Sequence, residues 1–293
     1  MSAQIPKRIL CPVDFSNHSA AALRAAGSLA KLSEAEVTVL HARRLDTPVY
    51  FTASQISSLR AQLKQSERAA RRYITRFADQ HLPETVRRSI VLKEEEPVMA
   101  ILDTVRDTSP DLIVLGTHGR TGLEKIRLGS VAESVLAHAP GPVLTIGPHA
   151  VTKILHNLGP IQRILCPVDT SAGASDLAQY AAMLAEIYKA QLTLIRVLEP
   201  KAAADFEIAQ KAQDELCDWV DKQVRGRCSA RHVIRSGHAA QQIIDLAETS
   251  KANLIVLGRS ARDFLGALFF GKTTEEVIRG APCPVLSLPI PHA

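Results

Sequence analysis

An internal repeat that runs through the whole chain constrains its fold more than any other feature of the sequence. The letters ILCPVD at Ile9–Asp14 recur at Ile164–Asp169, and the letters LIVLG at Leu112–Gly116 recur at Leu254–Gly258. A repeat of this length corresponds to a domain and not to the roughly 20–50-residue unit of a solenoid. The chain is therefore predicted to contain two copies of one domain in tandem.

The spacing of the two matches locates the domain boundaries. The offset in numbering is 155 from Ile9 to Ile164 but only 142 from Leu112 to Leu254, a fall of 13. The second copy is therefore shorter between these matches, most simply near Leu45–Ala53. The segment Gly147–Pro160 holds glycine, proline and histidine, and it is expected to be a linker. We therefore expect domains at residues 1–148 and 161–293.

Each copy is expected to alternate strands and helices. The run at Arg8–Val13 is continuously apolar, which is typical of a strand buried on both faces. Further strands of the first copy are expected at Val37–Ala42, Val86–Leu92, Leu112–Gly116 and Val143–Ile146, and helices at Ser16–Leu32, Gln55–Gln80, Pro97–Asp107 and Ser130–His138. The second copy repeats this order, which predicts an α/β fold with two doubly wound parallel-sheet domains, right-handed crossovers and helices on both faces.

Composition argues against membrane-spanning and disulfide-rich classes of protein. No apolar run reaches the roughly 18–20 residues that a membrane-spanning helix needs. The apolar stretch at the N-terminus ends at Asp14, which is not the pattern of a signal peptide. The 5 cysteines include no C-x-x-C pair, so they are expected to be buried, reduced thiols. We expect a cytoplasmic protein that does not bind membranes.

The basic excess of the chain lies in its first copy. Residues 1–155 hold 20 Lys and Arg against 15 Asp and Glu, whereas residues 156–293 hold 15 of each. Much of the excess falls on one predicted helix, at Arg60, Lys64, Arg68, Arg71, Arg72 and Arg76. No known nucleic-acid-binding motif accompanies these cations, so a solvated helix face is favoured over a nucleic-acid-binding patch.

Asp14 follows the first strand at the edge of the sheet where such folds bind ligands. A carboxylate there can accept hydrogen bonds from a ribose hydroxyl or a base amino group. Asp14 or Ser16 can equally serve as the N-cap of the following helix. The repeat at Asp169–Ser171 does not distinguish these alternatives, because both predict it.

The loop after the fourth strand has glycines at Gly116, Gly119 and Gly129, and Ser130 then opens a helix. Glycines allow backbone amides to approach a phosphate closely, and a helix N-terminus adds free N–H groups and a favourable dipole. Positive charge is supplied nearby by Arg120, Lys125 and Arg127. From these residues alone, a phosphate site and a flexible turn both remain open.

Three motifs together resemble the universal stress protein family. They are Gly-x2-Gly-x9-Gly-Ser from Gly116, Pro-Val-Asp from Pro12, and Ala-Pro-x-Pro-Val-Leu from Ala139. The resemblance covers essentially the whole chain twice, as in the tandem members of that family. It implies a five-stranded parallel sheet of order 3-2-1-4-5 in each copy, the adenine-nucleotide alpha-hydrolase-like fold.

The resemblance also implies a ligand, because many members of that family bind ATP, normally with Mg²⁺. They hold adenine and ribose near the aspartate after the first strand, and the phosphates on the glycine loop. Carried over to this sequence, the implied nucleotide-binding residues are Asp14, Ala42, Gly116, Gly119, Arg120, Gly129, Ser130 and Val131.

The second copy departs from this pattern. Ala261 stands at the second glycine and Lys272 at the serine, so nucleotide binding there is a weaker expectation, at Asp169, Val197, Gly258, Gly271, Lys272 and Thr273. The apolar residues Phe264, Leu265, Leu268, Phe269 and Phe270 indicate packing against the other copy, a second chain or an apolar ligand. Gly266–Thr273 matches the P-loop formula, but no strand runs directly into its first glycine, so a working P-loop is not expected.

The first copy departs from the family pattern once. Glu94–Glu96 stands where the second copy has Ser236–His238, the commoner form of the family. Three carboxylates near the ligand edge either weaken phosphate binding or help to hold a cation. Elsewhere the sequence has no spacing typical of a metal site.

Three functions remain open at this stage. The leading hypothesis is a nucleotide-binding module for stress response or signalling. Efficient catalysis is not expected, because no nucleophile–base pair stands out in the sequence. The best acid–base candidate is His118. The others are a slow ATPase or phosphotransferase, and an interaction scaffold without a working nucleotide site.

The arrangement of the two copies is also predictable. Single-domain relatives often pair through their fifth strands, so Val143–Ile146 is expected beside Val285–Leu288 in an intramolecular pseudo-dimer. We further expect the full chain to form a homodimer.

Overall fold

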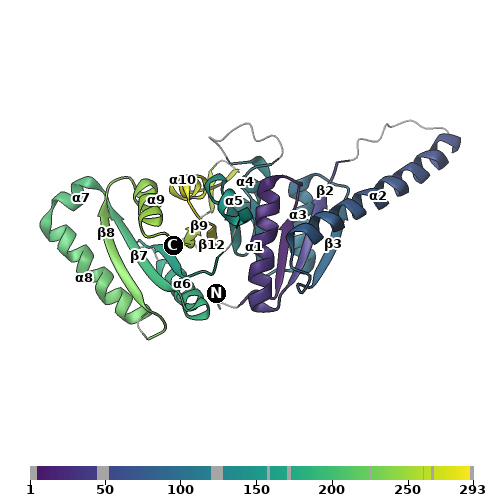
Figure 1. Cartoon of the computed structure of the whole chain (residues 1–293). Helices are drawn as coiled ribbons and strands as arrows, with labels where there is room; N and C mark the ends of the chain where they lie inside the picture. Colours follow the sequence, from purple (N-terminus) through teal and green to yellow (C-terminus); the bar gives the residue numbers. More distant parts are fainter. Residues whose placement is uncertain are drawn as a thin grey trace.

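The protein is represented by a computed structural model that describes residues 5–44, 53–119, 128–156, 159–169, 173–224, 226–259, 261–264 and 267–290 (Figure 1). The first half contains β1 (Arg8–Pro12), α1 (Asn17–Ser33), β2 (Glu36–Ala42), α2 (Ala53–His81), β3 (Arg88–Lys93), α3 (Pro97–Thr108), β4 (Leu112–Gly116), α4 (Ser130–His138), β5 (Val143–Ile146) and α5 (Pro148–His156). The second contains β6 (Arg163–Pro167), α6 (Ala174–Tyr188), β7 (Gln191–Leu198), α7 (Pro200–Ala204), α8 (Phe206–Gln223), β8 (Ala230–Ser236), α9 (Ala239–Thr249), β9 (Leu254–Arg259), β10 (Ala261–Phe264), β11 (Ala267–Phe270), α10 (Lys272–Gly280) and β12 (Val285–Pro289).

Ten of the strands form one continuous sheet of order β3-β2-β1-β4-β5-β12-β9-β6-β7-β8. Each half contributes five parallel strands in the predicted order 3-2-1-4-5. The two fifth strands, β5 and β12, pair antiparallel, with Val285 opposite Thr145 and Ser287 opposite Val143. The predicted fold class is therefore confirmed, and the two five-stranded sheets are joined edge to edge.

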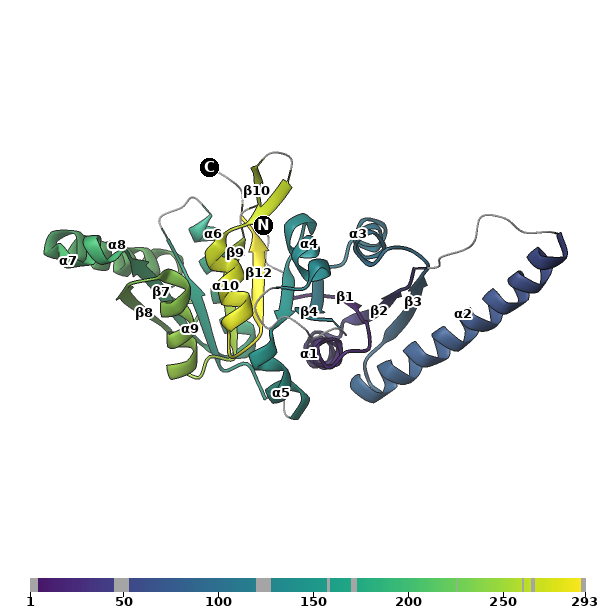
Figure 2. The same ribbon diagram turned by 90° about the horizontal axis from the view of Figure 1, so that it is seen from above.

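Helices cover both faces of the sheet, and successive residues of each strand point to opposite cores. Ile9 and Cys11 of β1 pack in the core under α1, α2, α5, α6 and α8, whereas Leu10 packs under α3, α4, α9 and α10. Figure 2 shows α3 and α4 on the opposite side of the first-half strands from α1 and α2. Strands buried on both faces explain the continuous apolar runs in the sequence.

The basic helix α2 presents its cations to solvent. Lys64, Arg68, Arg71, Arg72 and Arg76 are exposed, while Ile74, Phe77 and Ala78 are buried against the sheet. The side chain of Arg60 lies outside the described residues. Among the described residues, no helix combines the length and the hydropathy that a membrane crossing requires.

The segment Gly147–Pro160, which we expected to be a linker, lies between β5 and β6 and so joins the two halves, but it is largely helical. Most of this segment forms α5, whose side chains Ala150, Val151 and Ile154 are buried. The guanidinium of Arg24 in α1 donates a hydrogen bond of 2.6 Å to the carbonyl of Leu155. Tertiary packing on α1 therefore stabilises a helix in a segment whose glycine, proline and histidine content indicated a linker.

The position of the length difference between the two copies agrees with the prediction. β2 begins at Glu36 and β7 at Gln191, an offset of 155, whereas β3 begins at Arg88 and β8 at Ala230, an offset of 142. The second half is therefore shorter between its second and third strands. The predicted location, near Leu45–Ala53, falls between these strands, although residues 45–52 lie outside the described part of the chain.

The second-half loop contains an antiparallel hairpin that the sequence did not indicate. β10 pairs with β11, with Ala261 opposite Phe270 and Phe264 opposite Ala267. The extended β11 occupies the middle of the P-loop formula, so that stretch is not a curved phosphate-binding loop. The structure does not describe the side chains of this hairpin or residues 265 and 266. The predicted apolar cluster therefore lies outside the described residues.

A buried arginine of the second half holds a helix of the first half. Arg259, at the end of β9, is 3% exposed and donates hydrogen bonds to the carbonyls of Leu136, Ala139 and Gly141 at 2.5–2.6 Å. Carbonyls at the C-terminal end of a helix lack partners within the helix, and a cation there interacts favourably with the helix dipole. Burial lowers the pKa of Arg259 to about 10, well above neutral pH, so the side chain remains charged.

We expect Arg259→Met to lower the free energy of unfolding by about 2–4 kcal/mol, because three carbonyls, two of them in buried residues, lose a charged donor. The midpoint of urea denaturation, followed by circular dichroism, measures this change. Arg231→Met, which replaces an exposed arginine of β8, is the matched control and should change the midpoint little. Equal midpoints for Arg259→Met and the unsubstituted protein would contradict this role.

Candidate functional site

A pocket of about 340 Å³ opens at the carboxyl ends of β1 and β4. The strand order reverses between these two strands, which is where open α/β sheets bind ligands. Seven of the eight residues predicted for the first copy line it: Asp14, Ala42, Gly116, Gly119, Gly129, Ser130 and Val131. The eighth, Arg120, lies outside the described residues, as do Lys125 and Arg127.

The structure assigns the N-cap to Ser16 and places Asp14 in the lining of the pocket. Ser16 is the N-cap of α1, and its hydroxyl accepts a hydrogen bond of 3.2 Å from the amide of Ser19. Asp14 Oδ1 accepts hydrogen bonds from the amide and the hydroxyl of Ser16, at 3.0 and 2.6 Å. Asp14 therefore fixes the cap while it lines the pocket.

Phe15 makes the turn that separates Asp14 from α1. Its φ of 67° lies in the left-handed region, which is unfavourable for a bulky residue. The Phe15 ring packs on His41, Tyr73 and Phe77, with centroid distances of 4.5, 4.6 and 5.3 Å. This aromatic packing offsets the backbone strain and holds the sharp bend after β1.

The glycines of the loop are explained by neighbouring atoms that leave no room for a Cβ, and not by a positive φ. A Cβ at Gly116 would lie 2.6 Å from the Cβ of His18, where α1 crosses β4. A Cβ at Gly119 would lie 2.9 Å from Asp14 Oδ2, so the loop after β4 passes directly against the aspartate after β1. The Gly129 amide donates a hydrogen bond of 2.8 Å to the carbonyl of Thr117, which closes the loop at its base.

The N-terminus of α4 faces the pocket without a capping side chain. Its N-cap is Gly129, and Ser130, Val131 and Ala132 of the first turn line the cavity. The first amides of a helix lack partners within the helix and carry partial positive charge. This arrangement suits an anion, and phosphates are typical occupants of such sites.

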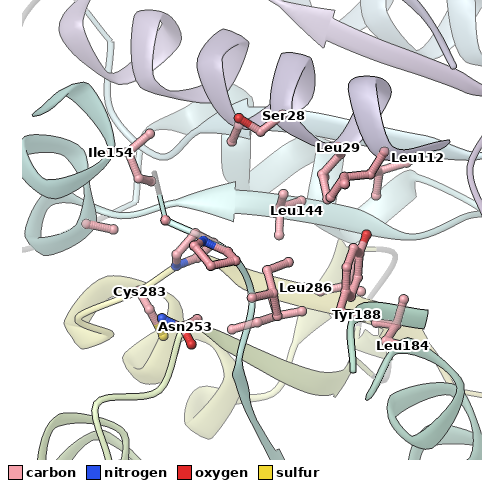
Figure 3. A pocket seen from close by; sticks show the side chains of 18 of the residues that line it. Ser28, Leu29, Leu112, Leu144, Ile154, Leu184, Tyr188, Asn253, Cys283 and Leu286 are labelled. Carbon is pink, nitrogen blue, oxygen red and sulfur yellow. The ribbon is translucent and has the colours of Figure 1, made fainter. Parts of the chain in front are cut away.

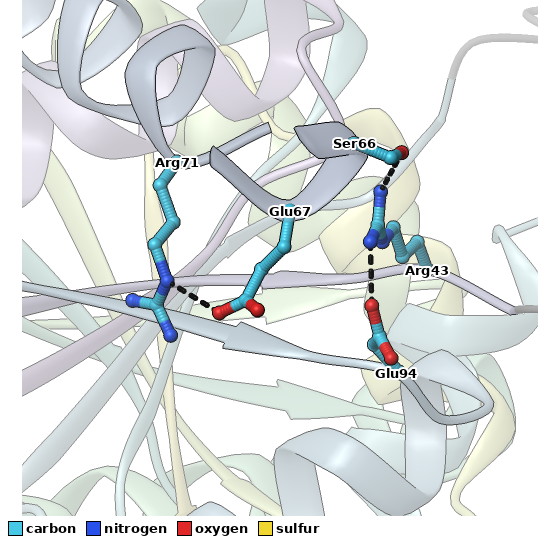
Figure 4. A network of polar contacts seen from close by, with 5 residues as sticks. All are labelled: Arg43, Ser66, Glu67, Arg71 and Glu94. Carbon is cyan, nitrogen blue, oxygen red and sulfur yellow. Dashed lines mark hydrogen bonds and ion pairs between the residues drawn. The ribbon is translucent and has the colours of Figure 1, made fainter. Parts of the chain in front are cut away.

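The run of three glutamates has structural partners. Glu94 forms an ion pair with Arg43, whose guanidinium also donates a hydrogen bond of 2.9 Å to Ser66 (Figure 4). Glu96 is the N-cap of α3 and accepts hydrogen bonds from the amides of Val98 and Met99. Across the described residues, no group of three or more His, Cys, Asp or Glu side chains could hold a metal ion. Two of the three carboxylates therefore stabilise local structure.

The sequence singled out His118 and placed His18 near the ligand edge without assigning it a task. The rings of His18 and His118 are 5.2 Å apart, and His118 Nδ1 lies 2.9 Å from the hydroxyl of Thr117. Pro97 and Ile101 at the start of α3 also line the pocket, opposite the glycine loop. The favourable position of Pro97 at the first helical turn was the available signal for where α3 begins.

The second half repeats the backbone frame at the start of α10, with different side chains at the matching positions. Gly271 is the N-cap of α10 with φ −58° and ψ 144°, close to the −63° and 142° of Gly129. Asp169, Lys272 and Thr273 are exposed, and Lys272 lies 3.9 Å from Glu276 of its own helix. The predicted Val197 is half-buried and packs against the sheet core.

Gly258, the counterpart of Gly116, also has different surroundings. A Cβ there would overlap Cδ1 of Ile290, near the C-terminus. His18 fills this place in the first half, where it contacts Gly116. The two halves thus use different side chains to fill the space beside the end of the fourth strand.

Comparisons with known proteins agree with the repeat. The model of the universal stress protein family matches residues 6–147 and again residues 160–289. A universal stress protein of Mycobacterium tuberculosis is 25% identical over 237 residues, which cover 76% of this chain and 78% of the relative. A universal stress protein of Methanocaldococcus jannaschii is 33% identical over 141 residues, 48% of this chain and 81% of the relative.

A solved structure resembles the chain along almost its full length. The crystal structure of a universal stress protein from Archaeoglobus fulgidus has a TM-score of 0.66 and 21% identity, and the match covers 99% of each chain. At this identity the likeness supports the fold alone.

The half-buried histidine beside the pocket predicts a loss of stability in acid. Burial, and then the charge of His118, lower the pKa of His18 below 6.5, while Asp14 acts in the opposite direction. The unfolded chain therefore binds a proton at His18 more readily than the folded chain does. The stabilising contribution of neutral His18 is present above about pH 6.5 and is lost as the pH falls through the folded pKa. We expect His18→Gln to reduce the slope of the free energy of unfolding against pH below 6.5.

Chemical denaturation at a series of pH values measures this slope. The pKa of His81 is also lowered, by burial and by Arg24, so part of the slope should remain in His18→Gln. His138→Gln replaces an exposed histidine and serves as the control. The same slope in His18→Gln and the unsubstituted protein would show that His18 does not titrate differently on folding.

Proposed function

The chain belongs to the universal stress protein family, and we propose that its first half binds an adenine nucleotide, with ATP as the expected ligand. The observation that carries this proposal is the convergence of four separate segments on one pocket. Asp14 follows β1, Ala42 ends β2, Gly116 ends β4 with Gly119 after it, and Gly129–Val131 forms the cap and start of α4. A pocket of about 340 Å³ lies within the range of small-molecule sites, roughly 300–1,000 Å³.

Each end of the pocket suits one part of the proposed ligand. The first-turn amides of α4 and the Ser130 hydroxyl are placed to donate hydrogen bonds to phosphate oxygens. The Asp14 carboxylate is placed to accept hydrogen bonds from ribose hydroxyls, and Ala42 and Leu40 offer an apolar wall to the base. Arg120 is proposed to add positive charge near the phosphates.

Mg²⁺ fits this site as a companion of the triphosphate. Asp14 is the acidic side chain among the described lining residues, and Mg²⁺ in nucleotide sites is commonly held by one or two carboxylates together with phosphates and water. The bound ion would neutralise part of the phosphate charge. Asp14 is the residue of this chain that would contact it.

We propose a non-catalytic role in stress response or signalling, located in the cytoplasm. Among the described lining residues, His118 is the acid–base candidate, and its Nδ1 is engaged with the Thr117 hydroxyl. A slow ATPase would use the same pocket, and steady ADP production that disappears in Gly119→Ala would favour it. An interaction scaffold would bind none of ATP, ADP or AMP.

We also propose that the two halves, at residues 1–148 and 161–293, form an intramolecular pseudo-dimer. The antiparallel pairing of β5 and β12 supports this proposal. The edges of the sheet are β3 and β8, so a homodimer of the full chain would have to use another surface than the fifth strands. Two separately expressed pieces, residues 1–156, which keep α5 on α1, and residues 161–293, should associate, as measured by analytical ultracentrifugation.

Asp14→Ala should weaken ATP binding at least about tenfold, because it removes a charged hydrogen-bond acceptor from the pocket. Isothermal titration calorimetry measures the affinity, and a stoichiometry of about one per chain is expected for the unsubstituted protein. Asp169→Ala, at the repeated position of the second half, is the matched control and should bind ATP normally. Equal losses in both variants would oppose the assignment of the site to the first half.

Gly119→Ala should also weaken ATP binding, because its Cβ would meet Asp14 Oδ2 at 2.9 Å and displace either the loop or the carboxylate. Gly141→Ala is the control, since a Cβ at Gly141 has no neighbour within 4 Å. Binding as tight in Gly119→Ala as in Gly141→Ala would mean that the loop does not contact the nucleotide.

A further inference from the structure

A second cavity, of about 440 Å³, lies between the two halves on the face of the sheet covered by α1, α5 and α6 (Figure 3). Its floor consists of Leu112, Leu144, Leu254 and Leu286, from β4, β5, β9 and β12. The repeat relates Leu112 to Leu254 and Leu144 to Leu286, since both pairs have the offset of 142. The floor therefore consists of two pairs of leucines that the repeat relates to each other. The pairing of the two fifth strands brings these pairs together.

This cavity is separate from the proposed nucleotide pocket. Leu112 and Leu144 face the core under α1, whereas Leu115 and Ala132, which line the nucleotide pocket, face the core under α3 and α4. The two cavities thus lie on opposite faces of the sheet. A ligand in one does not occupy the other.

The walls break the symmetry of the floor. The repeat, at its offset of 155, places Tyr180 of α6 where α1 has the small Ala25. Tyr188, near the end of α6, lines the cavity together with Leu184, and Figure 3 shows these two side chains near each other. Neither tyrosine hydroxyl has a hydrogen-bond partner among the residues that the structure describes. Burial raises the pKa of Tyr180 to about 12, so its hydroxyl stays protonated and able to donate.

The charged residues of the cavity are all positive. Lys31 of α1 and Lys153 of α5 line it and are exposed, and neither forms an ion pair within the described part of the chain. The described lining contains no Asp or Glu. An apolar interior with unpaired ammonium groups at its surface favours a ligand that has an apolar body and an anionic head.

We propose that this cavity binds a fatty carboxylate, with the aliphatic chain on the leucine floor and the carboxylate beside Lys31 and Lys153. An aliphatic chain matches a floor of four leucines, and the protonated tyrosine hydroxyls add donors that favour an oxygen acceptor. The cavity volume lies within the range of sites for small ligands.

Isothermal titration of the full chain with dodecanoate, below its micelle-forming concentration, tests the proposal. One molecule should bind per chain. Ser28→Trp, which places a large side chain in the wall of the cavity, should weaken binding at least tenfold. The Lys31→Glu/Lys153→Glu variant should bind dodecanoate at least tenfold more weakly than the unsubstituted protein. Its affinity for dodecan-1-ol should change less than twofold, because the alcohol lacks the negative head.

Controls separate this site from loss of folding and from the nucleotide pocket. Lys201→Glu, on the exposed α7, should bind dodecanoate normally. Asp14→Ala should also bind it normally, and thermal melts report whether each variant is folded. Absence of dodecanoate binding, or equally tight binding in a folded Ser28→Trp variant, would overturn the site. Equal effects of the lysine substitutions on acid and alcohol would overturn the carboxylate assignment.

Discussion

The antiparallel pairing of β5 with β12 is the interaction on which the rest of the architecture depends. It turns two five-stranded sheets into one and covers two apolar strand edges that would otherwise be open to aggregation. Two buried hydroxyls reinforce the junction: Thr145 donates to the carbonyl of Val285 at 3.1 Å and Ser287 to that of Val143 at 3.2 Å. The leucine-floored cavity and the reach of Arg259 into the first half both follow from this junction.

Helix α4 links the junction to the candidate nucleotide pocket. Its N-terminus lines the pocket, and its C-terminal carbonyls accept hydrogen bonds from Arg259 of the other half. At the aligned position the first half has Thr117, which helps to close the glycine loop. The same position of the repeat thus closes the glycine loop in the first half and contacts the other half from the second. The divergence of the second loop therefore has a structural role.

The repeat and the apolar periodicity were enough to predict the strands, because strands depend on burial patterns along short segments. The order of the strands and the pairing of the fifth strands were implied by the resemblance to the family. The helix α5 and the hairpin β10–β11 were missed because tertiary contacts, such as Arg24 with Leu155, override composition. The pocket residues could be named from motifs, but the contact between Gly119 and Asp14, and the ion pair between Glu94 and Arg43, join segments far apart in sequence. Such contacts follow from the folded geometry alone.

The central claim is that nucleotide phosphates bind at the start of α4 and not at the start of α10. Hydrogen–deuterium exchange of the full chain, with and without ATP and Mg²⁺, tests it most directly, because both helix starts have the same backbone frame. The account predicts that ATP slows exchange of the amides at 129–132 and leaves those at 271–274 unchanged. Protection at 271–274 alone, or at neither segment, would contradict it.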